Sequence, residues 1–489
     1  MMYTDLDKTR SFNESNDNNL EEDFRNAFER DYARVIHSPS FRRLQGKTQL
    51  FPSIESDFFR NRLTHSLEVA QLAKGIANKI NSKYFPNDKD NQIDLDLVNF
   101  AGISHDLGHP PFGHQGEEAL NECMHQHGGF EGNAQTLRIL SKLEKKIQIG
   151  DVRFGGFDQQ KNGLDKREGL NLTYRSLASI LKYNTPIFVD STKRDIKDIK
   201  VKKGYYHLES DLVSRIIGNV SNGKKYDEPF KTIECQIMDI ADDIAYSTFD
   251  LEDVFKSGFI NPFDILSAKK SFYEKVSEKV TKAFRAAEDY ETTIDRDDVI
   301  DVISDIFKEL FDLEQIDGFK ELKKVELSTE EYVFMGSQYA YRFSQSIAKD
   351  GYLRTAFSSK LVSKAISSIK FERNYTIPAL SKLSLSQTAK IRIEILKQVA
   401  FQTQILSPKL KIVEYRGKEI IKKIFETLIK GDGFELLPDD FRIIYENSDT
   451  AEHRYRTVCD YVACMTDKYA IEFYGRLTSE NPETIFKPY

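Results

Sequence analysis

Helical periodicity dominates the hydrophobic pattern of the chain. Apolar residues recur at intervals of three and four over 24–35, 63–73 and 95–107, and the last stretch runs towards a Pro-Pro pair. Two later stripes, at 299–310 and 420–428, repeat the i, i+3, i+4, i+7 spacing of a helix with one apolar face. Strand signals are short and scattered, the clearest at 187–189 and 410–415. The pattern predicts a mainly α fold with additional C-terminal helical layers and at most a small β-hairpin.

The distribution of residue types predicts four parts along the chain. Residues 1–20 are rich in Asn, Asp and Ser and lack apolar periodicity, which predicts a disordered or frayed tail. We expect a helical core over 21–262 with a Gly-, Lys- and Asp-rich insert at 151–205. A helical region over 263–400 and a C-terminal helical region over 401–489, packing back on the core, complete the chain. The lysine-rich run in the insert is typical of a solvated loop, with a phosphate or nucleic-acid contact as the alternative.

Composition narrows the class of protein. The 489 residues carry 70 Lys+Arg against 77 Asp+Glu, a net charge of -7, which argues against a chain-wide basic surface for nucleic acid. No stretch approaches the ~18 consecutive apolar residues of a membrane span, and the N-terminus lacks the apolar segment of a secretory signal. We therefore expect a cytoplasmic protein without a membrane partner. The four cysteines show no CxxC pair, so free, buried thiols are expected rather than disulfides or a cysteine zinc site.

Histidine is the informative residue type. Seven of the nine histidines lie in the first 127 residues, which suggests a site. His105-Asp106 follows an apolar helical stretch, and His109, four residues on, would share a helix face with His105. His114 follows the turn Pro110–Gly113, with Glu117 three residues later. The other early histidines outside this group, His37, His125 and His127, are interpreted as packing or surface residues.

A second group of polar residues lies between 234 and 250. Asp242, Tyr246 and Asp250 have i, i+4, i+8 spacing, so a regular helix would present two carboxylates and a phenol along one stripe. The pattern leaves open whether this stripe faces the site or whether the acids face solvent while Ile240 and Ile244 face the core. Imidazoles and carboxylates together make a mixed N/O set suited to a divalent metal. Open coordination positions of such an ion would suit phosphoester hydrolysis.

These residues resemble the HD-domain phosphohydrolases, and within them the deoxyguanosine triphosphate triphosphohydrolases (dGTPases) and related dNTP triphosphohydrolases. The resemblance covers nearly the whole chain from residue 31 to beyond 460, far more than a lone His-Asp pair. It is carried by these blocks: Arg34–Ser38, Phe41–Gln49, Arg62–Ser66, His105–His114, Glu131–Gln135, Gly169–Thr173, Ala241–Tyr246, Asp460–Val462 and Met465–Asp467.

The resemblance implies a role for each matched residue. The implied metal ligands are His65, His105, Asp106 and Asp242. His114, supported by Glu117, matches the catalytic histidine, which would act as nucleophile, base or acid at the α-phosphorus, and His109 matches a phosphate-side contact. The implied substrate contacts are Gln49 and Leu50 at the sugar and base, Tyr246 and Asp250 near the 3′-hydroxyl, and Arg62, Lys182 and Lys202 at the triphosphate. Arg62 pairing with a neighbouring acid is the alternative for that residue, and the register at Lys202 is uncertain.

The same resemblance implies an activity and its partners. The expected reaction is metal-dependent hydrolysis of dGTP, or of other dNTPs, to the deoxynucleoside and inorganic triphosphate. One divalent ion per subunit is implied, Mn or Mg first, with Co, Fe, Ni or Zn as alternatives. A homo-oligomer, commonly a hexamer, and a regulatory nucleotide or single-stranded DNA are further family expectations. Two rival functions stay open: an HD phosphohydrolase of monophosphates or cyclic nucleotides, and a nucleotide- or DNA-sensing module with weak activity.

The sequence departs from the family pattern at two places. Asp243 follows the implied ligand Asp242, where some animal relatives carry a phosphate-binding lysine, so the triphosphate charge must be met by other cations. Ala463-Cys464 precedes the Met-Thr-Asp block, where a small Gly or Ser is common. Local packing there is expected to differ.

Overall fold

The structure, a computed structural model, divides into two compact units. It describes residues 1–11, 25–50, 59–145, 157–158, 164–165, 167–188, 200–227, 229–258, 260–287, 291–310, 328–405 and 408–478. The first unit comprises Met1–Asp242, Phe371–Leu383 and Ile412–Tyr489, and the second comprises Asp243–Lys370 and Ser384–Lys411. Helices α9 and α18 each run across a boundary between units.

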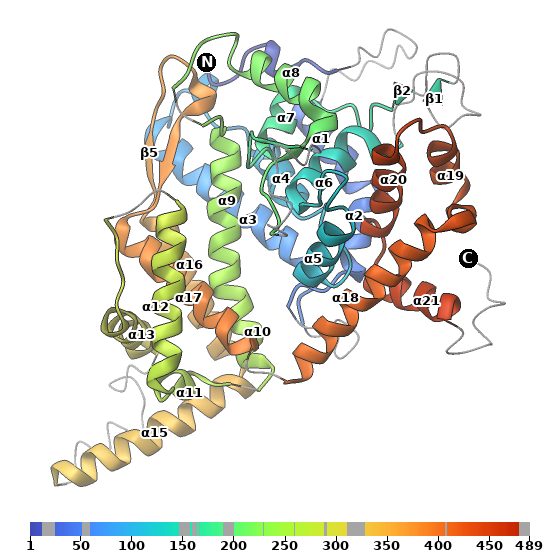
Figure 1. Ribbon diagram of the computed structural model, residues 1–489. Helices are drawn as coiled ribbons and strands as arrows, with labels where there is room; N and C mark the ends of the chain where they lie inside the picture. The colour runs from blue at the N-terminus through green and yellow to red at the C-terminus, as the bar shows by residue number, and fades with distance from the viewer. Residues whose placement is uncertain are drawn as a thin grey trace. The chain divides into compact units, whose positions relative to one another are not determined.

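Helices make up most of the first unit (Figure 1). Its N-terminal helices are α1 (Ala27–Ile36), α2 (Pro39–Arg43), α3 (Arg62–Tyr84), α4 (Leu95–Ser104), α5 (Gly113–Cys123), α6 (Gly132–Arg138), α7 (Tyr174–Ser179), α8 (Ser210–Val220) and α9 (Ile233–Ala245). Its C-terminal helices are α18 (Pro408–Ile429), α19 (Asp439–Glu446), α20 (Ala451–Ala463) and α21 (Asp467–Thr478). The helices predicted at 24–35, 63–73, 95–107 and 420–428 are confirmed as α1, α3, α4 and α18.

Helix α4 lies at the centre of the first core. It packs against both α3 and α1, and Leu97, Val98 and Phe100 are fully buried. Apart from Asp96 and Asn99, the side chains of α4 after its first residue are apolar or small, so most of its surface must be covered by neighbouring helices. The side chain of Asp94 caps its first turn by accepting from the amides of Asp96 and Leu97.

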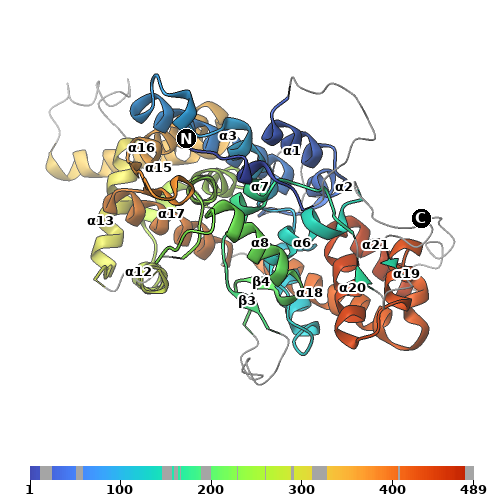
Figure 2. The same ribbon diagram turned by 90° about the horizontal axis from the view of Figure 1, so that it is seen from above.

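The C-terminal helices α18, α19, α20 and α21 lie together (Figure 2) and share a second core with α5 and α6. Leu120 and Ala134 contribute to it from the early helices, while Ile421, Phe425 and Val458 contribute from α18 and α20. A buried ionic link reinforces this packing. Arg138 of α6 donates from Nε to a carboxylate oxygen of Asp460 in α20, at 2.8 Å, and Gln135 donates to the same carboxylate at 3.0 Å.

The second unit is a separate helical assembly with its own core. Its helices are α10 (Leu251–Lys256), α11 (Pro262–Leu266), α12 (Lys270–Ala286), α13 (Arg296–Leu310), α15 (Thr329–Lys349), α16 (Gly351–Ser367) and α17 (Gln387–Ile405). The predicted stripe at 299–310 lies in α13, and its residues Val299, Ile303, Ile306 and Phe307 are buried. Phe307 from this face stacks on Phe357 at 6.0 Å between ring centroids and packs against Phe255.

Strands in the described chain are very short. They pair as β1 (Phe157–Asp158) with β2 (Leu164–Asp165), β3 (Pro186–Ile187) with β4 (Tyr205–Tyr206), and β5 (Lys370–Glu372) with β6 (Lys382–Ser384). The mainly α class is confirmed. Of the strand signal at 187–189, only Ile187 lies in β3; residue 188 follows the strand, and residue 189 lies outside the described residues. The strand signal at 410–415 is wrong, because this segment is helical and belongs to α18. The preference of its few β-branched residues for strands is weaker than the helical pattern that continues through 420–428.

The start of the chain is ordered, in contrast to the frayed tail predicted for residues 1–20. Met2 is buried, and the Tyr3 hydroxyl donates to Glu234 of α9 at 2.8 Å. Arg175, fully buried in α7, donates to Glu234 at 3.0 Å and to Asp7 at 3.1 Å. Polar side chains can therefore order a segment that lacks apolar periodicity. Residues 12–20 of the predicted tail lie outside the described residues.

Residues 167–188 of the predicted insert contribute to the first core. Leu172, Tyr174 and Leu177 are buried in it, and α7 packs against α8. Most of the lysine-rich run at 193–203 lies outside the described residues. The four cysteines are free, as predicted, although Cys123 and Cys464 are half-buried rather than buried. In the described part of the chain, no helix combines the length and apolar character needed to cross a membrane.

Replacing Arg175 with methionine is expected to lower the free energy of unfolding by roughly 3–5 kcal/mol, because two buried carboxylates lose their cation. Burial opposes the charge of Arg175, but Glu234 and Asp7 together keep its pKa above the usual range. Urea denaturation measures the change. The matched control is Arg42→Met on the exposed face of α2, for which we expect less than about 0.5 kcal/mol. Equal effects of the two substitutions would contradict the role of this buried cation.

Candidate active site

Two helices bring the first pair of histidines together. His65 lies in the first turns of α3, which begins with a capping box between Asn61 and Thr64. Helix α4 crosses α3 closely at Gly102, where an added Cβ would lie 2.4 Å from the Cα of Ala70. Only glycine permits this approach. The rings of His65 and His105 consequently lie 5.5 Å apart between centroids.

Helix α4 ends at Ser104, and His105 caps it. The Nδ1 of His105 donates to the carbonyl oxygen of Gly102 at 2.7 Å. Because a carbonyl only accepts, Nδ1 carries a proton, and Nε2 is the ring nitrogen directed at the site. This Nε2 lies 3.4 Å from an oxygen of Asp106 and 3.5 Å from an oxygen of Asp242.

A third element supplies the last acid of the group. Asp242 of α9 places a carboxylate oxygen 3.2 Å from Nε2 of His65. His65, His105 and Asp106 have ligand atoms within 4.8 Å of one another and are all buried. The structure thus brings all four predicted ligands together. Two imidazole nitrogens and two carboxylates around one point are a donor set that fits a divalent transition metal.

Cations and histidines hold the acids in their charged form. Burial works against the carboxylate of Asp106, but the neighbouring His109, His105 and Arg62 bring its pKa well below the usual range. Arg62 donates from Nη1 to Asp106 at 2.6 Å. Arg62 therefore pairs with an acid, which was the alternative interpretation of this residue. Its buried Nε makes no hydrogen bond with any described residue.

His109 reaches the site by a route that the sequence does not predict. The chain leaves the helix after Ser104 and forms turns over 105–108, so His109 does not share a helix face with His105. The prediction of a shared face is wrong because it assumed that the helix continues to the prolines. The turn nevertheless places Nδ1 of His109 3.0 Å from a carboxylate oxygen of Asp106.

His114 and Glu117 form the pair that their spacing predicts. Both lie in α5, with Nδ1 of His114 3.3 Å from an oxygen of Glu117. Burial opposes the charge of Glu117, but His114, Lys203, His109 and the amide of Gly132 lower its pKa to about 2. The hydrogen bond to Glu117 raises the pKa of His114, against its partial burial. The His114 side chain is 65% exposed, so it is open to a bound substrate.

Two lysines border the acids and histidines of the site. Lys182 lies between Asp239, at 2.8 Å, and Asp242, at 3.2 Å. Lys203, the residue after the predicted Lys202, donates to Glu131 at 3.1 Å, and its charge acts on both His114 and Glu117. Lys202 is half-buried.

Sequence analysis missed Asp239 and Lys203. The signals for them were the i, i+3 spacing of Asp239 and Asp242 on α9 and the length of the lysine run. The run alone does not show which of its lysines reaches the site; the contact between Lys203 and Glu131 does.

The remaining predicted contacts divide between the two units. Gln49 and Leu50 lie in the first unit, half-buried, and the buried Oε1 of Gln49 makes no hydrogen bond with a described residue. Tyr246 and Asp250 lie in the second unit, on the π-helical segment Tyr246–Asp250 that follows α9. Because wider π turns interrupt the α-helical spacing, the predicted stripe through Asp242, Tyr246 and Asp250 is not a regular one.

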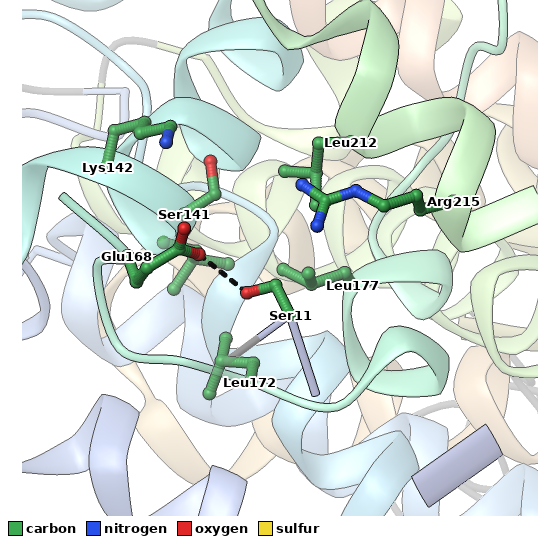
Figure 3. A pocket seen from close by; sticks show the side chains of 9 residues that line it. Ser11, Ser141, Lys142, Glu168, Leu172, Leu177, Leu212 and Arg215 are labelled. Atoms are coloured by element: carbon green, nitrogen blue, oxygen red, sulfur yellow. Dashed lines mark hydrogen bonds between the residues drawn. The ribbon is translucent and has the colours of Figure 1, made fainter. Parts of the chain in front are cut away.

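A small pocket with a cavity volume of about 20 Å³ lies elsewhere in the first unit (Figure 3). Four leucines and five polar or charged residues line it, among them Ser11, whose hydroxyl donates to Glu168 at 2.6 Å. None of the predicted site residues lines it. It is thus separate from the cluster of histidines and acids.

Comparison with known proteins identifies the family. The family described as "HD domain" matches residues 62–156, and the family described as "Phosphohydrolase-associated domain" matches residues 383–476. The chain is 43% identical to "Deoxyguanosinetriphosphate triphosphohydrolase-like protein 2" of Mesorhizobium japonicum, over 100% of both chains. It is 32% identical to a deoxyguanosinetriphosphate triphosphohydrolase-like protein of Aliivibrio fischeri, over 93% of both, and 32% identical to one of Deinococcus radiodurans, over 95% of both.

The HD domain match implies binding of a divalent metal, and the cluster of His65, His105 and Asp106 lies within the matched range. A metal-dependent phosphohydrolase fits both the match and the donor set. The chain therefore belongs to the deoxyguanosinetriphosphate triphosphohydrolase-like family of HD-domain proteins.

Proposed function

We propose that the protein hydrolyses dGTP to deoxyguanosine and inorganic triphosphate, with the other dNTPs as the nearest alternative substrates. The observation that carries the proposal is the convergence of His65, His105, Asp106 and Asp242. It is supported by the full-length similarity of the chain to a protein named deoxyguanosinetriphosphate triphosphohydrolase-like. We also propose one divalent ion per subunit, Mn or Mg, and a homohexamer, both on the resemblance of the sequence to the family.

The four clustered residues would hold the metal ion. When bound, the ion supplies positive charge that polarises the α-phosphoryl group and offsets developing negative charge. The imidazole of His105 is pre-oriented for this task by its bond to Gly102, and ordering of a ligand by a second contact strengthens a metal site. Lys182 keeps Asp242 charged despite burial, holding its pKa well below the usual range.

His114 would handle the proton at the reacting phosphorus. Water attacks the α-phosphorus in line with the 5′-oxygen of the nucleoside, and the bond from phosphorus to that oxygen breaks. A histidine whose pKa is raised by an adjacent carboxylate can give a proton to the leaving oxygen, and the neutral ring can accept one from water. Glu117 serves either role, because its low pKa keeps it charged beside the imidazole.

The substrate would lie over the exposed His114 with its phosphates towards the cations. Arg62 retains a guanidinium edge that is not used by Asp106, and a guanidinium fork suits phosphate oxygens. Lys182, Lys202 and Lys203 add positive charge. The buried Oε1 of Gln49 supports a polar contact with the sugar or base. Leu50 beside the base, and Tyr246 and Asp250 near the 3′-hydroxyl, complete the proposed contacts.

Product analysis tests the proposed reaction and separates it from its rivals. The purified protein is incubated with Mn or Mg and each of the four dNTPs and GTP in turn, and the products are resolved by anion exchange. Tripolyphosphate from dGTP alone supports the dGTPase proposal, while tripolyphosphate from all four dNTPs supports a broader dNTPase. Orthophosphate as product, or turnover of monophosphates or cyclic nucleotides only, would reject both.

The pH dependence of kcat/KM is expected to show a limb above pH 6.5, since Glu117 raises the pKa of His114 from that value. If the protonated ring is required, activity falls as the pH rises above the pKa of His114. If the neutral ring is required, activity falls as the pH drops below that pKa. In Glu117→Gln the imidazolium loses its anionic partner, so its pKa decreases and the limb moves to lower pH in either case. A profile from about pH 5.5 to 9 measures the shift. A limb that stays in place would assign it to another group.

A further inference from the structure

The segment that joins His109 to His114 has an unfavourable backbone conformation. Phe112 has φ +61° and Gly113 has φ +57°, both in the left-handed region. For a bulky residue such as phenylalanine this conformation costs free energy, and it persists only where the surroundings impose it. Residues 109–113, here called the histidine loop, lead directly into α5, which carries His114 and Glu117.

Asp467 holds the backbone of the histidine loop. It is the first residue of α21, is 5% exposed, and accepts a hydrogen bond on Oδ1 from the amide of Phe112 at 3.0 Å. Its Oδ2 accepts from the amide of Thr48 at 2.9 Å and from the Thr48 hydroxyl. One carboxylate therefore fixes both the histidine loop and the residue preceding Gln49.

Gly417 of α18 lies against the side chain of the same phenylalanine. An added Cβ at this glycine would lie 2.7 Å from Cγ and 2.8 Å from Cβ of Phe112. These atoms are next to the backbone, so rotation of the ring cannot relieve the overlap. The phenylalanine is thus held by its amide from α21 and by its side chain from α18.

Lys47 links the start of the loop to the end of α20. It is 2% exposed, and its Nζ donates to the carbonyl oxygens of His109 and of Ala463, the latter at 3.0 Å. A buried ammonium is costly unless its hydrogen bonds are satisfied. The ammonium therefore holds the two carbonyls at fixed separation.

We propose that the C-terminal region matched as phosphohydrolase-associated domain positions the histidine loop through Asp467 and Gly417, and that Lys47, which bonds to Ala463 of that region, is a third positioning residue. The inference rests on the proposed function, because His109 and His114 are assigned their roles there. It gives the C-terminal helices a part in turnover beyond covering the core. None of the three residues is a metal ligand in the proposed site.

Two substitutions test the proposal, each with a different expected effect. Gly417→Ala displaces Phe112 alone, although alanine is the better helix former. Asp467→Asn replaces one acceptor oxygen with an NH2 group and removes the negative charge from the other, so the contacts to both Phe112 and Thr48 are weakened. The matched control is Gly475→Ala in α21, where an added Cβ meets no atom within 4 Å.

Hydrogen exchange and kinetics report separately on geometry and function. In both test variants we expect faster amide exchange in peptides covering 109–113, measured without substrate, and unchanged Mn binding. We expect kcat to fall roughly 10- to 100-fold, as for small displacements of catalytic groups. KM should rise in Asp467→Asn only, because that variant also releases the segment carrying Gln49. Gly475→Ala should match the wild type in every respect.

Several results would overturn the proposal. Unchanged exchange in the histidine loop, or full turnover with faster exchange, would remove the positioning role. An equal loss in Gly475→Ala would reduce the effect to general destabilisation. If either variant fails to fold, Thr48→Val removes only the hydroxyl contact to Asp467 and should raise KM roughly 3- to 10-fold; an unchanged KM counts against the proposal. If the wild type hydrolyses no dNTP, the proposed function fails, while the exchange data still decide whether Asp467 fixes the loop.

Discussion

Replacing Asp106 with asparagine is expected to reduce turnover by at least about 10³-fold, more than the 10- to 100-fold typical of changes to groups that only orient metal ligands. Asp106 lies within ligand distance of His105 and is kept charged by three neighbouring cationic or imidazole groups. An amide has no negative charge and one oxygen fewer to offer to a metal. Isothermal titration with Mn should show the loss of binding alongside the loss of activity.

Two further variants make the interpretation secure. Asp106→Asn also removes the anionic partner of Arg62, so its thermal unfolding must be compared with the wild type. His65→Ala leaves the Arg62–Asp106 ion pair intact and should abolish Mn binding as well. Asp88→Asn, an exposed acid, serves as the control with full activity. Undiminished turnover of either site variant would reject the proposed metal centre.

The second large effect is expected at His114. In His114→Ala, kcat should fall roughly 10²- to 10⁴-fold, the range usual for loss of a general acid or base. Mn binding should stay intact, because His114 is not one of the four proposed metal ligands and its side chain is 65% exposed. Single-turnover kinetics with the metal bound would locate the defect in the chemical step.

Matched controls distinguish a catalytic role from a loss of helix stability. His453→Ala removes an exposed histidine from the first turn of α20 and should leave kcat unchanged. Glu117→Gln keeps the shape of the partner side chain and should give a smaller defect, roughly 10-fold, together with the shifted pH limb. Wild-type kcat in His114→Ala would assign the proton transfer to another residue, with His109 the nearest candidate.

Much of this arrangement follows from local pattern. The apolar spacing predicts α1, α3, α13 and α18, because each of these helices buries one face. The spacing of His114 and Glu117 predicts their contact for the same reason. The clustering of histidines early in the chain points to the region where His65 and His105 meet.

Other features depend on contacts that no local pattern contains. Helix α4 ends at Ser104 and is followed by turns over 105–108. His109 therefore does not lie on the helix face that the spacing predicts. Asp467 lies some 350 residues from Phe112 in the chain, so their hydrogen bond follows only from the fold. The ordered start of the chain depends on Arg175. Its carboxylate partners, Asp7 and Glu234, are far apart in the sequence. Which lysine of the run borders the site likewise follows only from the fold, in which Lys203 contacts Glu131.

The most direct test of the central claim is hydrolysis of dGTP in water labelled with ¹⁸O. Attack of water on the α-phosphorus, with departure of the 5′-oxygen, places one labelled oxygen in tripolyphosphate and none in deoxyguanosine. Mass spectrometry of the two products reads the label directly. Label found in deoxyguanosine, or in orthophosphate released from the γ position, would contradict hydrolysis at the α-phosphorus.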